Sequence, residues 1–180
     1  MSKPMPDFRP PLLASLVVLS LAGCASPASR EGMQVAATPA LHQSPRTVSV
    51  RTAGGTDTGA LDSTNIADAD FKAAIEESIT QSKVFSRVIQ GGGADYDLSV
   101  TVVRLTKPLA GFSMTVEMEA AWSLVRRQDK GVVMRKTIAS TYTAGMSDAF
   151  AGVTRLHMAV EGAARANITQ GLQEISALKL

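Results

Sequence analysis

The strictest pattern in this chain is a two-residue alternation of apolar and polar side chains that runs from residue 113 to residue 124. Successive side chains of a β-strand point to opposite faces of a sheet, so the pattern predicts a long strand with one buried and one exposed face. Such a strand needs another element to cover its apolar face. The apolar positions are Met114, Val116, Met118, Ala120, Trp122 and Leu124.

Two further segments alternate in the same way, residues 96–102 before this strand and residues 132–142 after it. Short turns that contain Gly separate the three segments. This order predicts an antiparallel β-meander with one covered face. The expected covered positions are Tyr96, Leu98, Val100 and Val102 in the earlier segment, and Val132, Met134, Ile138 and Tyr142 in the later one.

Residues 66–82 have a helical pattern instead, with apolar side chains at four-residue steps from Phe71 to Ile79. Polar side chains occupy the other faces. The pattern predicts an amphipathic helix that packs on an apolar surface. Asn65 or Asp68 would cap its start by accepting a hydrogen bond from a free backbone N–H group.

A second helical pattern covers residues 148–178, with Asp148 as the expected N-cap. Gly152, Gly162 and Gly171 interrupt it, and each glycine costs about 1 kcal/mol relative to Ala inside a helix. Either the glycines allow the helix to approach the sheet closely, or one of them breaks the helix. We favour close packing.

Together these elements predict an α+β fold, in which an antiparallel β-meander sheet is packed on one face by two helices, the second long and C-terminal. Short β-rich stretches at 47–51 and 83–89 predict two more strands. We expect a single domain over residues 46–180. Residues 24–45 are rich in Ala, Ser and Pro and predict a flexible tether about 25 Å long.

Residues 1–23 have the layout of an export signal. Lys3 and Arg9 precede an apolar run at 11–22, and Gly23-Cys24 follows it. About 12 helical residues span about 18 Å, which is less than the ~30 Å of a bilayer core. The run therefore does not predict a permanent transmembrane anchor.

The tetrapeptide Leu21-Ala22-Gly23-Cys24 resembles a bacterial lipobox. The resemblance implies cleavage between Gly23 and Cys24, and diacylglycerol and palmitate attached to Cys24. Since Cys24 is the only cysteine, an internal disulfide is excluded, and the alternative is an ordinary signal that leaves a free thiol. Ala25 stands where an Asp would resemble the inner-membrane retention signal, so the resemblance implies the outer membrane, facing the periplasm, rather than the inner membrane.

The charge balance gives no support for nucleic acid as a partner. Lys3, Arg9 and Asp7 lie in the leader, so 16 of the 18 basic and 15 of the 16 acidic residues remain, a net charge of +1. Nucleic-acid binding requires a clustered basic face that neutralises phosphates. The basic group at residues 126–136 indicates a solvated turn, with contact to anionic lipid as the alternative.

No catalytic motif is present: the sequence lacks HExxH, GxSxG, an EF-hand loop and paired CxxC motifs. A catalytic triad would have to use His157, for which an ordinary helix-surface role is the alternative. The carboxylate pairs Asp95/Asp97 and Glu117/Glu119 fall on the polar face of strands, without the burial that a general acid needs. We therefore predict that the protein is not an enzyme and that it holds no cofactor and no metal.

The succession of lipobox, tether, strand, helix, meander and C-terminal helix resembles small Gram-negative outer-membrane lipoproteins of the envelope-transport auxiliary and LPS-assembly accessory types. Residues 70–85 followed by 94–100 resemble their helix-then-strand signature. The resemblance implies a membrane-anchored, non-catalytic binding or adaptor protein, auxiliary to transport or to outer-membrane assembly. Its implied partners are the membrane, through the lipid, and another envelope protein.

The turn after the first meander strand supplies the one specific contact surface. Leu109 and Phe112 would form an apolar tip that contacts a partner protein or lipid; alternatively Phe112 folds back on the core. Two other function classes stay open. One is the binding of a lipid-like small ligand in a cavity lined by Met114, Met118 and Trp122, and the other is a hydrolase with a hydroxyl nucleophile.

Overall fold

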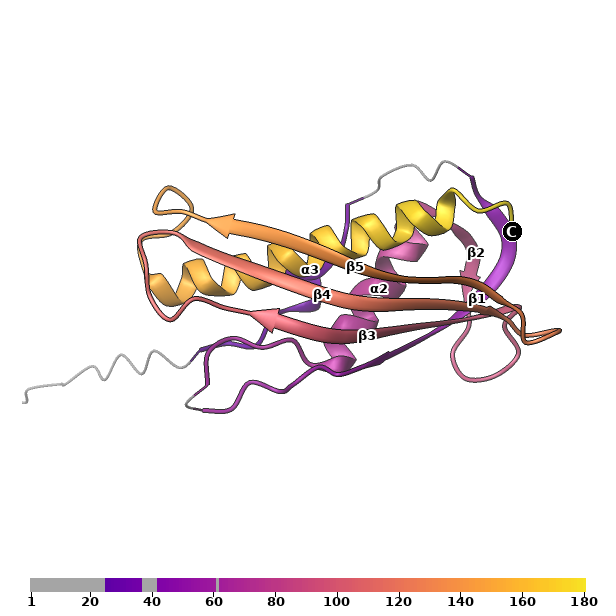
Figure 1. The fold of residues 1–180 in the computed structure, drawn as a ribbon, viewed down its shortest axis with the longest axis horizontal. Helices are drawn as coiled ribbons and strands as arrows, with labels where there is room; N and C mark the ends of the chain where they lie inside the picture. The colour runs from indigo at the N-terminus through magenta and orange to yellow at the C-terminus, as the bar shows by residue number, and fades with distance from the viewer. Residues whose placement is uncertain (1–24, 37–41, 61) are drawn as a thin grey trace, which may run out of the picture.

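The computed structural model describes residues 25–36, 42–60 and 62–180 (Figure 1). Within these residues, five strands form a single sheet and three helices accompany it. The elements in chain order are α1 (Arg30–Met33), β1 (Ser44–Ala53), α2 (Asp68–Ser82), β2 (Phe85–Val88), β3 (Tyr96–Thr106), β4 (Met114–Arg126), β5 (Val132–Ala144) and α3 (Gly152–Ser176).

The strand order is β2-β1-β3-β4-β5, and α2 and α3 lie against the same face of the sheet (Figure 1). α3 packs along β4 and β5, whereas α2 packs on β1 and β2. The other face carries exposed side chains, among them Thr115, Glu117 and Thr141. The core therefore lies between the sheet and the two long helices.

The sheet is mixed, which corrects our expectation of an antiparallel one. β1 pairs in parallel with β2 and with β3, and only β3, β4 and β5 form the predicted antiparallel meander. The reason is the connection through α2. A helix that joins two neighbouring strands carries the chain back to the starting end, so the second strand runs parallel to the first.

The buried faces of β3 and β4 are the predicted ones. Trp122 of β4 is paired with Val100 of β3, and every predicted apolar position of these two strands is buried. β5 differs at two of the positions that we expected on the covered face. A register shift pairs Val132 with Val125, which points away from the covered face, and Val132 is 52% exposed. Tyr142 lies on the covered face opposite Val116 but is 38% exposed, because β5 is the edge strand; Ile138, Ser140 and Ala144 are buried.

The predicted helix caps are not used. Ala67 and Ala151 are the N-cap residues of α2 and α3, and neither makes a side-chain cap hydrogen bond. The side chains that we expected to cap these helices are engaged elsewhere. Asn65 accepts from the Lys107 amine at 2.5 Å, Asp68 from the Gly55 N–H at 2.9 Å and Asp148 from the Gly145 N–H at 2.7 Å.

α3 is continuous and approaches the sheet closely at two of its glycines. A Cβ atom on Gly171 would lie 2.5 Å from Cζ2 of Trp122, and one on Gly162 would lie 2.3 Å from Cγ of Tyr142. Close packing is thus confirmed for these two positions. Gly152 is the first residue of the helix.

Residues 25–36 fold against the domain, which differs from the flexible tether that we expected. Ala28 and Met33 are buried, and the N–H of Ala28 donates to the carbonyl of Asn65 at 3.0 Å. α1, which forms part of this segment, contacts both α2 and α3. The few apolar side chains of the segment are enough to hold it because the long helices offer a complementary surface.

The residues of the expected export signal, including Gly23 and Cys24, lie outside the described residues, as do residues 37–41 of the expected tether. Cleavage and acylation at Cys24 therefore stay predictions. Among the described residues, no helix is both long and apolar enough to cross a bilayer.

Candidate functional site

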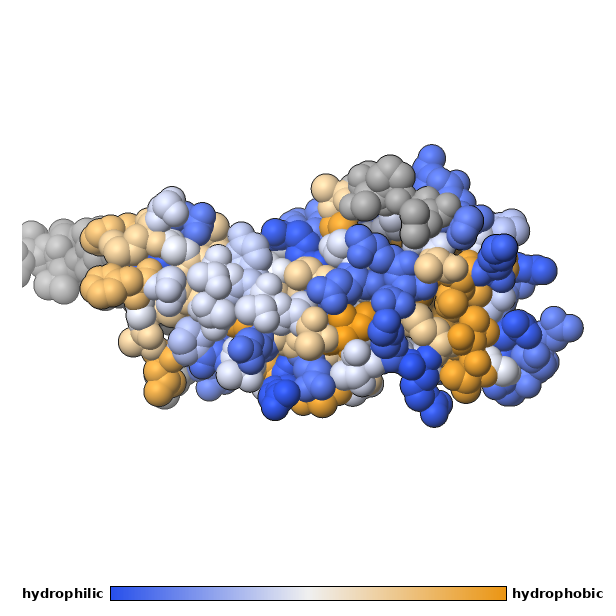
Figure 2. Space-filling model, turned by 45° about the horizontal axis from the view of Figure 1, so that its top comes forward, coloured by the Kyte–Doolittle hydropathy of each residue, from blue (hydrophilic) through white to orange (hydrophobic). Residues whose placement is uncertain are grey.

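Exposed apolar side chains gather at one end of the molecule, which we call the apolar end and define by Leu109, Phe112, Met146, Phe150 and Val153. Leu109, Phe112 and Phe150 are 105%, 83% and 88% exposed, so Phe112 does not fold back on the core. This is the left end in Figure 2, which shows hydrophobic surface here and also in a strip nearer the right end. A cluster of large exposed apolar side chains marks a surface that binds a protein, a membrane or an apolar ligand.

The meander explains why these residues meet. Met114 at the start of β4 pairs with Ala144 at the end of β5. The β3–β4 turn and the loop from β5 to α3 therefore leave the sheet at the same end (Figure 1). The turn carries Leu109 and Phe112, and the loop carries Phe150.

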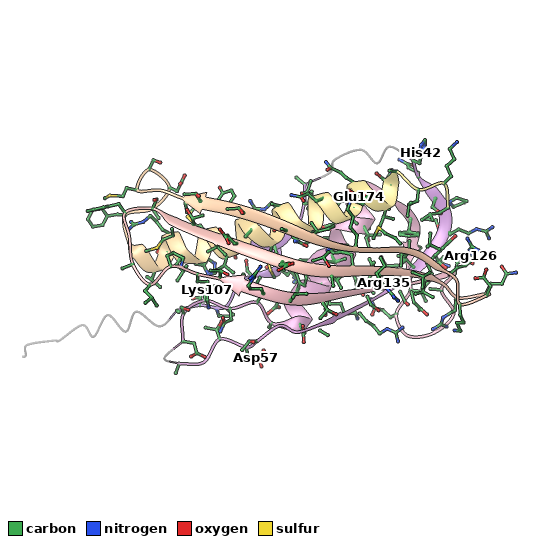
Figure 3. All side chains as sticks on the ribbon, viewed as in Figure 1. His42, Asp57, Lys107, Arg126, Arg135 and Glu174 are labelled. Atoms are coloured by element: carbon green, nitrogen blue, oxygen red, sulfur yellow. The ribbon has the colours of Figure 1, made fainter. Side chains whose placement is uncertain are left out.

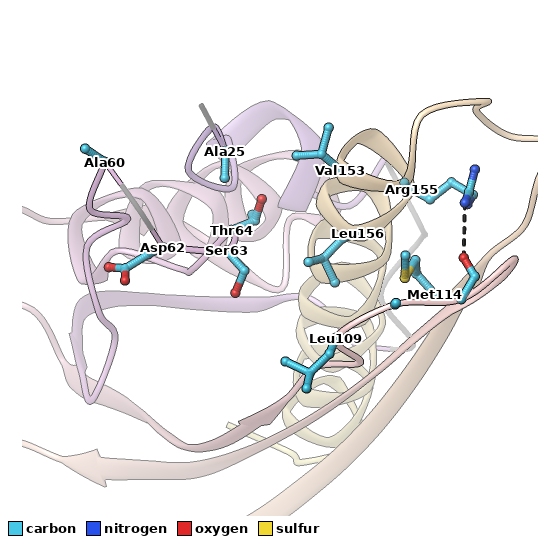
Figure 4. A pocket seen from close by; sticks show the side chains of 13 residues that line it. Ala25, Ala60, Asp62, Ser63, Thr64, Leu109, Met114, Val153, Arg155 and Leu156 are labelled. Atoms are coloured by element: carbon cyan, nitrogen blue, oxygen red, sulfur yellow. Dashed lines mark hydrogen bonds between the residues drawn. The ribbon is translucent and has the colours of Figure 1, made fainter. Parts of the chain in front are cut away.

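A buried arginine joins these two loops. The Nη1 atom of Arg155 donates to the carbonyls of Ala149 at 2.9 Å and Phe150 at 2.6 Å, and its Nη2 atom donates to the carbonyl of Gly111 at 3.1 Å (Figure 4). A planar guanidinium can serve several acceptors at once. Arg155 therefore holds the turn and the loop together as one surface.

A hollow of about 630 Å³ lies beside the apolar end, and the described chain begins on its wall (Figure 4). Leu109, Val153 and Leu156 line it together with Ala25. Ala25, which directly follows the predicted acylation site in the sequence, thus lies beside the apolar end.

The basic group of the sequence lies at the opposite end, around the β4–β5 turn. Figure 3 shows Arg126 and Arg135 far from Lys107, which follows β3. Arg126 is paired with the carboxylate of Asp129 at 2.9 Å. The arrangement fits a solvated turn and separates the basic end of the molecule from the apolar end.

His157 lies in a polar cluster that does not have the order of a catalytic triad. Its Nε2 atom is 2.9 Å from Oε1 of Glu161, and the hydroxyl of Ser29 donates to the same oxygen at 2.6 Å. In a triad the histidine stands between nucleophile and carboxylate, whereas here the carboxylate stands between the other two. Ser29 also caps α1 by accepting from the Gly32 N–H. The cluster fastens residues 25–36 to α3.

Asp95 and Asp97 both have lowered pKa values. The backbone N–H and then the hydroxyl of Thr47 donate to Asp95 and lower its pKa. Burial acts to raise the pKa of Asp97, but the hydrogen bonds from Ser49 and Arg127 and the positive charge nearby outweigh burial and lower it. A carboxyl with a lowered pKa is ionised at neutral pH and has no proton to donate as a general acid.

Replacing Asp97 by Asn should lower the free energy of unfolding at pH 7 by about 1 kcal/mol, because hydrogen bonds to a carboxylate are lost or weakened. The lowered pKa means that ionised Asp97 stabilises the fold above the ordinary value of 3.8, and that this stabilisation is lost as the pH falls through the folded-state pKa. Thermal unfolding of Asp97→Asn should therefore depend less on pH in the acid range than that of the wild type.

The exposed carboxylate of Asp57, in the loop after β1, offers a matched control for this measurement. Asp57→Asn should keep the acid sensitivity of the wild type. If Asp97→Asn loses stability in acid as steeply as the wild type does, Asp97 is not a source of that sensitivity.

Two of the side chains expected to line a ligand cavity between helix and sheet belong to the core. Met118 and Trp122 are buried, and the Trp122 ring packs on α3. Met114 lines the hollow at the apolar end instead.

Across residues 25–36, 42–60 and 62–180, no three His, Cys, Asp or Glu side chains are grouped so as to hold a metal ion. Glu119 of the second carboxylate pair binds Arg104 at 2.9 Å.

Solved structures share this fold. Protein XCC0632 from Xanthomonas campestris, of family DUF330, has a TM-score of 0.62 at 17% identity, over 81% of this chain and 93% of that one. Hypothetical protein CT253 from Chlamydia trachomatis has a TM-score of 0.57 at 7% identity, over 74% of this chain and 97% of that one. PelC from Paraburkholderia phytofirmans, a dodecamer, has a TM-score of 0.50 at 17% identity, over 79% of this chain and 95% of that one.

These identities are low, so the likeness shows the fold alone. No protein-family model and no curated protein matches the sequence. None of the three structures is described as an LPS-assembly accessory protein, and the comparisons give that type no support.

Leu109 and Phe112 were expected from the sequence, whereas Met146, Phe150 and Arg155 were not. A signal for Met146 and Phe150 was present. The predicted meander already places the turn after its first strand at the same end as the exit of its third strand, and the segment after that strand contains Met146 and Phe150. The role of Arg155 had no such signal, because it depends on backbone carbonyls brought close only by folding.

Proposed function

We propose that this protein is a lipoprotein, acylated on Cys24, that acts as a non-catalytic binding or adaptor component of the bacterial envelope. The observation that carries the proposal is the position of Ala25 on the hollow beside Leu109 and Val153. An acyl group on Cys24 would emerge next to the most exposed apolar side chains of the domain. One end then faces the membrane, and the rest of the domain is left for a protein partner.

The finer placement within this proposal rests on the sequence. Ala25 in place of an Asp favours the outer membrane with the domain facing the periplasm. The resemblance to envelope lipoproteins favours a role auxiliary to transport or to outer-membrane assembly. A partner protein has a suitable template in β5, a 13-residue edge strand that pairs only with β4 among the described residues.

Two features of the chemistry support a non-catalytic role. His157 and Ser29 both bind the Glu161 carboxylate, so neither is arranged as a base and nucleophile pair. Asp95 and Asp97 are ionised at neutral pH, so neither serves as a general acid. Both sets of side chains contribute to holding the fold together.

Metabolic labelling with palmitate tests the anchor. The full-length protein should incorporate label and fractionate with membranes, and Cys24→Ala should lose all of the label because no second cysteine is present. Ser26→Ala, two residues away, is the matched control and should label like the wild type. An unlabelled wild-type protein, or a label that persists in Cys24→Ala, would contradict the proposal.

A further inference from the structure

We infer that the apolar end enters the lipid of the membrane to which Cys24 is anchored, so that the domain sits on the bilayer in one orientation. The inference rests on the proposed acylation and goes beyond it, because acyl chains joined to a flexible tether hold a domain near a membrane without orienting it. Three observations carry it: the short connection to the anchor, the character of the surface and its rigidity.

The connection to the anchor is short. Ala28 is buried, and its N–H donates to the carbonyl of Asn65 at 3.0 Å. Ala28 follows Cys24 by four residue steps, which span at most about 14 Å when fully extended. The part of the chain that is fixed to the domain therefore begins close to the lipidated residue. Ala25 lies at the apolar end, so this end is the part of the domain that meets the membrane.

The surface is suited to lipid. Two phenylalanines, Phe112 and Phe150, and Leu109 are almost fully exposed on adjacent loops. Residues 107–113 and 145–153 contain only two charged side chains, Lys107 and Asp148. The Lys107 amine donates to the Thr64 carbonyl at 2.9 Å, and Asp148 accepts from the Gly145 N–H at 2.7 Å. Few charges must therefore be moved from water when these loops enter the interface.

The surface is also held in shape. Arg155 binds carbonyls of both loops, so the phenylalanines on them are presented together. Its Nε atom is buried without a hydrogen-bond partner among the described residues, which adds to the cost of burying this side chain. A costly buried cation at this position indicates that the loops need a fixed arrangement, as a membrane-inserting surface does.

Apolar contact, rather than attraction to anionic headgroups, drives this insertion. The basic side chains Arg126 and Arg135, on either side of the β4–β5 turn, lie at the opposite end (Figure 3). A polybasic membrane contact would need Lys and Arg side chains beside the lipid anchor. Insertion by aromatic and aliphatic side chains to about 5–10 Å at the headgroup boundary requires none.

Tryptophan quenching in proteoliposomes tests the inference. Acylated full-length Phe112→Trp and Phe150→Trp would be reconstituted in phosphatidylcholine vesicles with bromine on the acyl chains. Val132→Trp is the control, because Val132 is 52% exposed at the opposite end of the sheet. The native Trp122 is buried in all variants, and its signal is subtracted with the wild type. Palmitate labelling of each sample shows whether the anchor is present.

We expect quenching and a blue shift of the added tryptophan at positions 112 and 150, neither at position 132, and no dependence on salt. Labelled protein without quenching at 112 and 150 overturns the insertion and leaves the anchor standing, as would be found if these side chains bound a protein partner. Equal quenching at 132 overturns the fixed orientation. Unlabelled protein overturns the proposed function and this inference with it.

Discussion

Asn167→Leu should lower the free energy of unfolding by about 3–4 kcal/mol, although Leu has nearly the same size as Asn. Asn167 lies buried on α3, against the sheet. Its Oδ1 atom accepts from Nε1 of Trp122 at 2.9 Å, and its Nδ2 atom donates to the carbonyl of Ile138 at 2.9 Å. Leu can replace neither bond, and both partner groups would stay buried.

The size of the effect follows from the groups left unpaired. Each buried polar group that loses its partner costs roughly 1–3 kcal/mol, and the Trp122 N–H and the Ile138 carbonyl are two such groups. The Ser140 hydroxyl, which lies 3.2 Å from Nδ2 of Asn167, keeps the carbonyl of Ala163 as an acceptor. The extra apolar surface of Leu offsets only part of the loss.

Urea unfolding followed by circular dichroism measures the effect, and a double-mutant cycle with Trp122→Phe assigns it. Trp122→Phe removes the indole donor, so Asn167→Leu in that background leaves one unpaired group fewer. The sum of the stability losses of the two single variants should therefore exceed the stability loss of the double variant. Strictly additive losses, or an Asn167→Leu variant close to wild-type stability, would count against this account.

The meander was predictable because alternation reports which face of a strand is buried. The alternating segment at 113–124 became β4, with Trp122 and Leu124 on the covered face. Alternation does not report which strand is the neighbour. The parallel pairing of β1 with β3, such as Val50 with Leu98, depends on the crossover through α2, and a reading of each segment by itself misses it.

Competing hydrogen bonds explain the other departures from the expected fold. Asp148 and Asn65 are good N-cap residue types, but their side chains bind a turn N–H and the Lys107 amine instead. Residues 25–36 have a tether-like composition, yet Glu161 of α3 accepts from both the N–H and the hydroxyl of Ser29. The bonds of Ser29 cannot be read from local sequence, because Glu161 lies 132 residues further along the chain.

The apolar end was predictable only in part. The composition of one turn nominated Leu109 and Phe112, and the meander would have added Phe150. Whether these side chains point outward is set by the packing beneath them, in particular by Arg155. Sequence alone therefore located the region and left its exposure undecided.

Gly171→Ala should lower the free energy of unfolding by about 2 kcal/mol, although Ala is the better helix former by about 1 kcal/mol. The added Cβ would lie 2.5–2.6 Å from three atoms of the Trp122 ring. That ring is fully buried and rigid, and its Nε1 atom is bound to Asn167, so it cannot move aside. The steric cost therefore exceeds the gain in helix propensity.

The other glycines of α3 allow the stability losses of three Gly→Ala variants to be ranked. Gly162→Ala meets the ring of Tyr142, which is partly exposed on the edge strand and can rotate toward solvent, so the loss should be smaller. Gly152→Ala meets its nearest atom at 3.5 Å and should be neutral. Thermal unfolding of the three variants measures the order. Equal effects at all three would show that the distance between α3 and β4 is not what requires glycine at position 171.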